Sequence, residues 1–316
     1  MTELLVADVG GTGSRLALFQ DGRQITDPVS YANCDYDSFE SILDNFLAGT
    51  DCRPDLAACA VAGPVRSNSV QMTNLGWQLS GASLAQRFGL QHVEIINDFE
   101  ALAWATLSLK VSDLRQIGGG EPVRFASRGI LGPGTGLGVS GLVHNTKTWA
   151  AIVGEGGHVS MSAGSAKEAR LIKKAGEDFG HCSAERLLSG SGLALIYGYL
   201  GGGRQPPDTI SQRAISGEDI ALQAIELFCL MLGTVASNLA LTLGAQGGIY
   251  LAGGILPAIG DLFASSGFRS RFESKGRFSE YLSAIPTFVI TADYPSLSGL
   301  NFYMCQLEGK HYDRAK

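Results

Sequence analysis

The acidic residue Asp98 follows a short apolar run, residues 93–96, with Asn97 between them. The run has the length and residue types of a buried strand, so Asn97 and Asp98 are expected at its carboxyl end. Open α/β sheets bind ligands at that edge. A carboxylate there can take the proton of an attacking hydroxyl during phosphoryl transfer. The alternative is that Asp98 only caps a helix expected over residues 99–107.

A first glycine-rich turn spans residues 8–13 and lies between two apolar runs, 4–7 and 14–19. The pattern predicts a β-hairpin. Glycines let a phosphate approach the backbone, where a turn of N–H groups can hold it. Asp8 can accept hydrogen bonds from magnesium-bound waters. The alternative is that Asp8 hydrogen-bonds its own backbone in an ordinary turn.

A second glycine-rich turn, residues 132–138, joins strands expected at 129–131 and 139–143. Its four glycines exceed what a simple hairpin needs. The chain lacks the G-x-x-x-x-G-K-[ST] motif of P-loop enzymes and the H-R-D motif of protein kinases. A nucleotide would need another kind of cradle, which two glycine hairpins could form. The repeated pattern suggests a duplicated architecture with one such hairpin in each half.

Three further polar residues could hold a sugar. Glu155 and His158 lie in the glycine-rich stretch 154–158, and Glu185 follows Ser183. Planar polar side chains suit the adjacent hydroxyls of a sugar. The alternatives are a solvated loop, a metal site, and for Glu185 a first-turn acid favoured by the helix dipole. Metal ligation is weakly indicated because no H-x-x-x-H pair occurs.

The elements that must position these residues alternate between strands and helices, which predicts an α/β class with mostly parallel or mixed sheets. A helix at 39–47 is expected to be capped by Asp37 and ended by Gly49. Ser165 with Glu168 forms a capping box, and Ser183 caps another helix. We also expect a flexible loop at 201–207, a long helix at 219–243, and strands at 56–62 and 248–251.

The composition excludes several classes of protein. With 316 residues the chain has room for about two domains, and its net charge of −6 without a basic stripe disfavours nucleic acid as a partner. Six dispersed cysteines without a C-x-x-C pair fit a reducing compartment, and no signal peptide is recognised. Residues 227–260 carry no charge, but polar residues interrupt the run, so a buried helix and strand are expected there instead of a membrane span.

The order of these motifs resembles the bacterial ATP-dependent glucokinase family, part of the hexokinase–actin–Hsp70 superfamily. The resemblance covers nearly the whole chain. It rests on residues 8–12, 95–99, 134–138, 154–158, 183–186 and 252–255. The resemblance implies a two-domain actin-like ATPase (ribonuclease H-like) α/β fold with a cleft between the domains. The small domain would be residues 1–108, completed by a C-terminal helix at 299–316, and the large domain residues 109–298.

The resemblance also implies a reaction: the γ-phosphoryl group of ATP is transferred to the 6-hydroxyl of D-glucose, giving glucose 6-phosphate and ADP and feeding glycolysis. Asp98 would be the general base, and Mg²⁺ would be a cofactor bound through water near Asp8. Family members are commonly cytoplasmic homodimers. The implied sugar ligands are Asn97, Asp98, Glu155, His158 and Glu185; the implied nucleotide ligands are Asp8, Gly10, Gly11, Thr12, Gly134, Thr135, Gly136, Gly253 and Gly254.

One position departs from the family pattern. Members usually carry Asn after the first Gly-Gly-Thr, where this chain has Gly13. A glycine has no side chain to contact a ligand, so Gly13 is left out of the predicted site. Other functions stay open: a kinase for another hexose or an amino sugar, a different phosphoryl donor such as polyphosphate, or a catalytically silent sugar-binding regulator. A repressor is disfavoured because no helix-turn-helix segment precedes Asp8.

Overall fold

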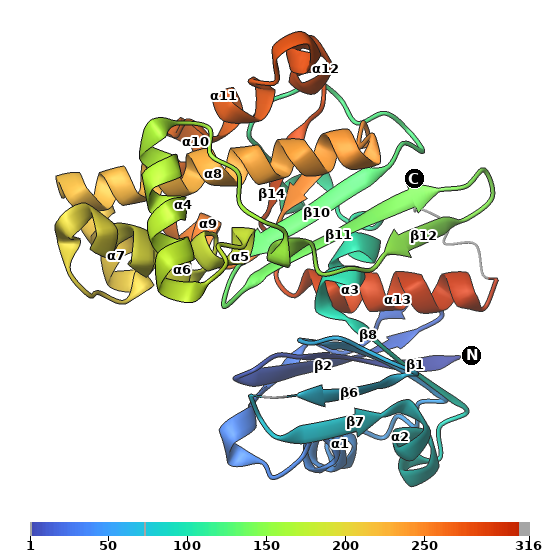
Figure 1. Cartoon of the computed structure of the whole chain (residues 1–316). Coiled ribbons are helices and arrows are strands. Elements are labelled where there is room, and N and C mark those ends of the chain that lie inside the picture. Colours follow the sequence, from blue (N-terminus) through green and yellow to red (C-terminus); the bar gives the residue numbers. More distant parts are fainter. Residues whose placement is uncertain (1, 73, 310–316) are drawn as a thin grey trace. The chain divides into compact units, whose positions relative to one another are not determined.

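The computed structural model describes residues 2–72 and 74–309, which form two compact units (Figure 1). Unit 1 comprises residues 1–110 and 292–316, and unit 2 comprises residues 111–291. Each unit contains a six-stranded mixed sheet. The domain limits expected from the sequence, 1–108 with 299–316 and 109–298, stay a prediction.

The sheet of unit 1 has the order β3-β2-β1-β5-β8, with β4 also paired to β2. β1 and β2 are antiparallel, whereas β1, β5 and β8 run parallel. The carboxyl ends of β1 and β8 therefore meet at one edge of the sheet. The strands are β1 (Glu3–Val9), β2 (Gly13–Gln20), β3 (Arg23–Gln24), β4 (Val29–Ala32), β5 (Leu56–Val61) and β8 (His92–Asn97); a separate ribbon pairs β6 (Ser69–Met72) with β7 (Trp77–Ser80).

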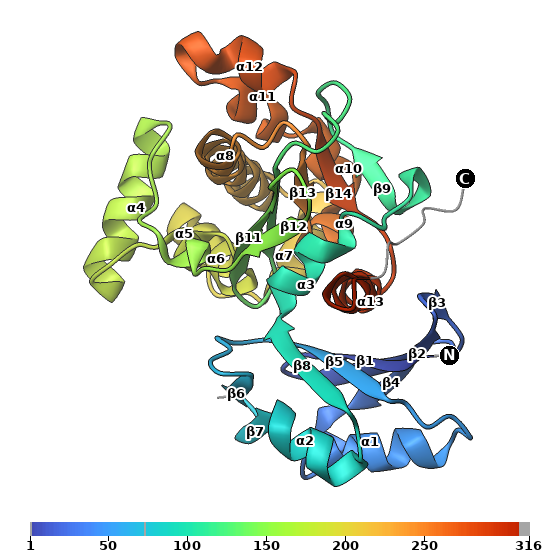
Figure 2. The same ribbon diagram turned by 90° about the vertical axis from the view of Figure 1, so that its right-hand side faces the viewer.

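Helices cover both faces of this sheet, α1 and α2 on one side and α3 and α13 on the other (Figure 2). α3 and α13 pack so closely that a Cβ on Gly299 would lie 1.9 Å from the Ala101 carbonyl oxygen, so only glycine fits there. The sheet therefore has a core on each face. The helices are α1 (Phe39–Ala48), α2 (Gly81–Phe88), α3 (Asp98–Ala105) and α13 (Pro295–Leu307).

Two helix ends of unit 1 differ from expectation. Ser38, not Asp37, caps α1, because its hydroxyl accepts from the Ser41 N–H at 3.3 Å. The cap moves by one residue because two capping side chains are adjacent and α1 begins at Phe39. The C-terminal helix begins at Pro295 instead of residue 299 and ends at Leu307. The remainder of the expected helix, residues 310–316, lies outside the described residues.

The sheet of unit 2 has the order β12-β11-β10-β13-β14-β9. β10 and β11 form an antiparallel hairpin, and β10, β13 and β14 run parallel. The repeat of strand, glycine turn and strand is thus confirmed, because each unit places its hairpin beside parallel strands. The strands are β9 (Leu114–Gln116), β10 (Arg128–Pro133), β11 (Leu137–His144), β12 (Trp149–Ile152), β13 (Ile249–Leu251) and β14 (Thr287–Ile290).

The predicted long helix is α8 (Asp219–Leu243), whose bounds are confirmed. By length and composition it is the one helix among the described residues that could cross a membrane, but 72% of its most apolar window is buried inside the protein. Its side chains pack within the core of unit 2 together with α6, α7 and α11. This is the environment of a core helix, as the interrupted apolar run predicts.

Among the other helices of unit 2, α6, α7 and α11 contact α8. The caps at Ser165 and Ser183 are confirmed. The prediction of a flexible loop at 201–207 is partly wrong, because residues 198–202 form a π-helical turn and α7 already begins at Pro207. The helices are α4 (Ala166–Phe179), α5 (Ala184–Leu187), α6 (Gly190–Tyr197), α7 (Pro207–Ile215), α9 (Ile255–Ile259), α10 (Asp261–Ser265), α11 (Phe268–Glu273) and α12 (Ser279–Ser283).

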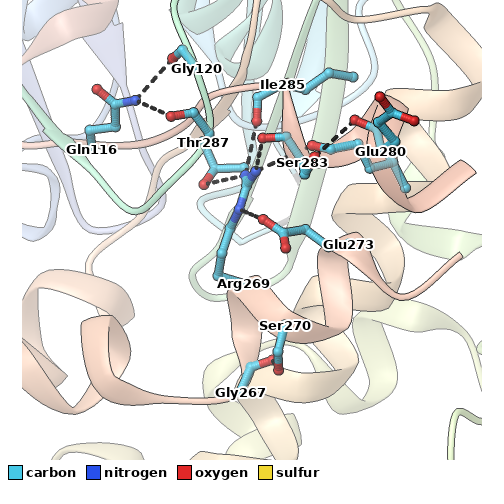
Figure 3. Close-up of polar contacts among 12 residues, drawn as sticks. Gln116, Gly120, Gly267, Arg269, Ser270, Glu273, Glu280, Ser283, Ile285 and Thr287 are labelled. Atoms are coloured by element: carbon cyan, nitrogen blue, oxygen red, sulfur yellow. Dashed lines mark hydrogen bonds and ion pairs between the residues drawn. The ribbon is translucent and has the colours of Figure 1, made fainter.

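Two arginines of α11 hold the helical part of unit 2 together. Arg269 donates to Glu273 at 2.6 Å and to the carbonyl oxygens of Ser283 at 3.0 Å and Ile285 at 2.9 Å, which ties α11 to the segment entering β14 (Figure 3). Arg271 forms a two-pronged ion pair, at 3.0 and 2.9 Å, with the fully buried Glu168 of α4. Loss of Arg271 would leave the buried Glu168 carboxylate without its counter-charge, so this pair ties α4 to α11.

Candidate functional site

Asp98 stands at the junction of β8 and α3. Asn97 is the N-cap of α3, because its Oδ1 accepts from the N–H groups of Phe99 at 2.9 Å and Glu100 at 3.4 Å. The alternative that Asp98 supplies the cap is therefore wrong, although its Oδ1 also accepts from the Phe99 N–H at 2.9 Å. The Asn97 amide nitrogen donates to the Gly63 carbonyl oxygen at 3.2 Å. The cap of α3 therefore does not depend on the Asp98 carboxylate.

The environment of Asp98 raises its pKa to about 6, chiefly through burial and also through repulsion by the Asp8 carboxylate. Hydrogen bonds from the backbone and from Asn97 act in the opposite direction but are weaker. A carboxylate with a pKa in this range holds and releases a proton near neutral pH. This is the property of a general base, and raised pKa values of this kind cluster at functional sites.

Asp8 lies at the end of β1 on the same sheet edge. The Ser296 hydroxyl, from the first turn of α13, donates to Asp8 Oδ2 at 2.6 Å. Burial raises the pKa of Asp8, while the Ser296 hydrogen bond and the Arg15 guanidinium lower it. Ser296 could not be predicted from the sequence, because 288 residues separate it from Asp8 and no local pattern links them. α13 therefore supports a carboxylate near the start of the chain.

Hydrogen bonds within the first glycine turn and from a neighbouring side chain hold the turn in place. The Gly10 N–H donates to the Gly13 carbonyl oxygen at 3.0 Å, and the amide of the buried Asn33 donates to the Gly10 carbonyl oxygen at 2.8 Å. Asn33 is a second residue whose role no local sequence pattern indicates. Gly11 is partly exposed and Thr12 exposed, as a ligand-binding turn requires. A Cβ at Gly13 would lie 3.1 Å from the Tyr31 carbonyl oxygen, so this position is too tight for the family's usual Asn without a local shift.

The second glycine turn is closed by a hydrogen bond from the Gly134 N–H to the Gly136 carbonyl oxygen at 2.8 Å. A Cβ at Gly134 would meet no atom within 4 Å, so the backbone there is open to a ligand. Thr135 is exposed. A Cβ at Gly136 would lie 2.4 Å from Glu185 Oε2, and the same oxygen accepts from the Leu137 N–H at 2.9 Å. The structure thus brings Glu185 directly to this turn.

His158 and Glu185 lie near each other, with His158 Nε2 3.9 Å from Glu185 Oε1. Both side chains are partly accessible, at 60% and 33% exposure, so they can reach a ligand. The exposed Glu155 joins them through the backbone, because its carbonyl oxygen accepts from the His158 N–H at 3.0 Å. Within residues 2–72 and 74–309, no three His, Cys, Asp or Glu side chains are grouped to hold a metal ion.

Gly253 and Gly254 follow β13. Gly253 has a φ of +90°, and a Cβ there would lie 2.3 Å from the Pro133 carbonyl oxygen. Packing against β10 therefore explains this glycine without any ligand. A Cβ at Gly254 would meet no atom within 4 Å, so that backbone is open to approach. The predicted residues thus form two sets: the acids and first turn in unit 1, and the second turn with His158 and Glu185 in unit 2.

Solved structures with the same architecture define the class of fold. A crystal structure of glucokinase from an Antarctic psychrotroph matches with a TM-score of 0.89 and 32% identity over 97% of this chain and 99% of that one. A ROK hexokinase from Thermus thermophilus matches with a TM-score of 0.71 over 97% of this chain and 100% of that one, at 15% identity. The protein therefore has the two-domain actin-like ATPase fold.

The family follows from the sequence comparisons. The family model named Glucokinase matches residues 5–307. The glucokinase of Neisseria meningitidis serogroup B is 45% identical over 93% of this chain and 92% of its own length, and that of Tolumonas auensis is 42% identical over 97% and 98%. The chain belongs to the glucokinase family.

Proposed function

We propose that the protein phosphorylates glucose, transferring the γ-phosphoryl group of ATP to the sugar's 6-hydroxyl. Its relatives named glucokinase support this reaction, with 42–45% identity over almost the full length of both chains. The structural observation that carries the proposal is Asp98, a carboxylate at a parallel-strand edge whose pKa is raised to about 6 while Asn97 provides the helix cap.

In this reaction Asp98 accepts the proton of the 6-hydroxyl as the oxygen attacks the γ-phosphorus in line. Asn97, Glu155, His158 and Glu185 accept from and donate to the remaining hydroxyls, and so fix which hydroxyl faces the phosphate. The first and second glycine turns bind phosphate oxygens through backbone N–H groups. The open Cβ directions of Gly134 and Gly254 are consistent with a closely approaching nucleotide.

The residues around Asp8 fit a magnesium ion that is bound mainly by phosphates and water. Ser296 occupies Asp8 Oδ2, and within the described chain no donor to Oδ1 is seen. A single carboxylate of this kind suits Mg²⁺, which keeps several of its waters when it binds nucleotides. Asp8 would hold the ion through such a water. When bound, the ion supplies positive charge against the phosphoryl oxygens.

A coupled ADP-release assay tests the proposal directly. Glucose, mannose, fructose and glucosamine are each assayed with ATP, ADP and polyphosphate as donors. We expect the highest kcat/KM for glucose with ATP. A higher value with another sugar or donor would reassign the substrate. Glucose binding measured by calorimetry without turnover would instead identify a silent sugar-binding regulator.

We further propose that the enzyme is a soluble cytoplasmic homodimer acting in glycolysis. The support is the family resemblance and the burial of α8 inside unit 2. Analytical ultracentrifugation across a range of protein concentrations tests the dimer. A sedimenting mass of 33.2 kDa at all concentrations would show a monomer.

A further inference from the structure

Glu185 makes a backbone contact that a sugar ligand alone would not need. Its Oε2 accepts from the Leu137 N–H at 2.9 Å, while its Oε1 lies 3.9 Å from His158 Nε2. Leu137 is the first residue of β11 and is 4% exposed. Buried backbone N–H groups are nearly always paired, so this donor depends on the carboxylate.

The same segment holds the second glycine turn at another point. The N–H of Gly190, the first residue of α6, donates to the Gly134 carbonyl oxygen at 2.8 Å. On the other side of the turn, a Cβ on Gly157 would lie 2.0 Å from the Leu137 carbonyl oxygen. The turn is therefore enclosed near Leu137 and anchored at Gly134, with Glu185 as its one charged contact among the residues described.

We propose that Glu185 positions the second glycine turn for the phosphates of a nucleotide, a role separate from its contact with sugar. This inference rests on the proposed function, in which that turn binds phosphate. Without the carboxylate, the Leu137 N–H loses its partner and the turn gains conformational freedom. Binding must then order the turn, so nucleotide affinity falls even when no sugar is present.

An opposing effect has to be separated from this one. A negative carboxylate beside the turn also repels phosphate, so removing its charge alone should strengthen nucleotide binding. Glu185→Ala removes both the hydrogen-bond acceptor and the charge. Glu185→Gln removes the charge but keeps an amide oxygen that can accept from the Leu137 N–H. The two variants therefore distinguish positioning from repulsion.

The first measurement is the dissociation constant of ADP and of AMPPNP, by calorimetry, with the full chain and no sugar. We expect Glu185→Ala to bind about tenfold more weakly than wild type, and Glu185→Gln to bind within about twofold or more tightly. Equal or tighter binding by Glu185→Ala would overturn the proposal and leave Glu185 as a sugar ligand only.

The second measurement is hydrogen exchange at the Leu137 amide without ligands, for which the turn offers a matched pair of variants. Gly136→Ala places a Cβ 2.4 Å from Glu185 Oε2 and should displace the carboxylate, whereas the Cβ of Gly134→Ala meets nothing within 4 Å. We expect faster exchange in Glu185→Ala and Gly136→Ala, and wild-type exchange in Glu185→Gln and Gly134→Ala. Unchanged exchange in Glu185→Ala would contradict the inference. Absence of nucleotide binding by the wild type, with exchange as expected, would refute the proposed function instead.

Discussion

Replacing Asp98 by Asn should move stability and activity in opposite directions. The folded protein raises the pKa of Asp98 from its ordinary value of 3.8 to about 6, mainly through burial. Raising the pKa of Asp98 from 3.8 to about 6 corresponds to ~3 kcal/mol of unfavourable free energy for the ionised side chain. Because Asp98 is partly exposed, we expect Asp98→Asn to raise the free energy of unfolding near neutral pH by only about 1–2 kcal/mol. Asn keeps the oxygen that accepts from the Phe99 N–H.

The pH dependence has a definite sign. A carboxyl whose folded pKa is raised contributes most to stability below pH 3.8, and this contribution is lost as pH rises through about 6. The amide introduced by Asp98→Asn cannot ionise, so the variant shows no such loss. Differential scanning calorimetry of the ligand-free protein should therefore give similar apparent Tm values near pH 4. The variant should be higher by several degrees at about pH 7.5.

The same substitution should abolish efficient turnover. Loss of a general base costs about 10²–10⁴ in rate, so we expect kcat to fall about 10³-fold with a nearly unchanged glucose dissociation constant. Asp219→Asn is a matched control, because Asp219 is an exposed acid at the first position of α8. It should leave kcat intact and lower stability slightly through the helix dipole. Near-normal turnover in Asp98→Asn, or a stability gain independent of pH, would refute the reasoning.

Two further substitutions test one support of the site, Ser296, and one support of the fold, Arg271. Ser296→Ala removes the hydroxyl that donates to Asp8, so the Mg²⁺ concentration for half-maximal activity should rise about three- to tenfold. Ser296→Thr keeps a hydroxyl and should stay near wild type. Titration of both variants with Mg²⁺ tests this, and equal responses would contradict it. Arg271→Ala removes the ion-pair partner of the fully buried Glu168 and should lower the free energy of unfolding, measured in urea, by about 3–5 kcal/mol. Arg87→Ala breaks an exposed pair with Asp44 and should lower it by under about 1 kcal/mol. Similar losses in the two arginine variants would refute the structural role of the α4–α11 pair.

Local patterns predicted the elements well where one signal dominates. The bounds of α8 follow from its apolar run and from Gly244, which ends the helix in the left-handed conformation. The predicted cap of α1, Asp37, was wrong by one residue, because Asp37 and Ser38 are adjacent capping side chains and Ser38 is the one used. The start of α13 was missed although Pro295, at its first position, is a readable start signal.

The site was harder to predict because its supports come from distant parts of the chain. The glycine turns and Asp98 are visible in the sequence as residue types at strand ends. The partners of these residues are not, because Ser296 and Asn33 reach Asp8 and Gly10 through the fold. Gly253 shows that a glycine within a recognised motif can also be required by packing, because a Cβ there would meet the Pro133 carbonyl oxygen.

The central claim is that Asp98 is the base, with its pKa raised by burial and by Asp8. The most direct measurement is kcat/KM for glucose between about pH 5 and 8 at saturating ATP and Mg²⁺. We predict a single ionisation at about pH 6, below which the rate falls about tenfold for each pH unit, and no such ionisation in the residual activity of Asp98→Asn. A profile that is flat down to about pH 5 in the wild type, or the same ionisation in the variant, would contradict the assignment.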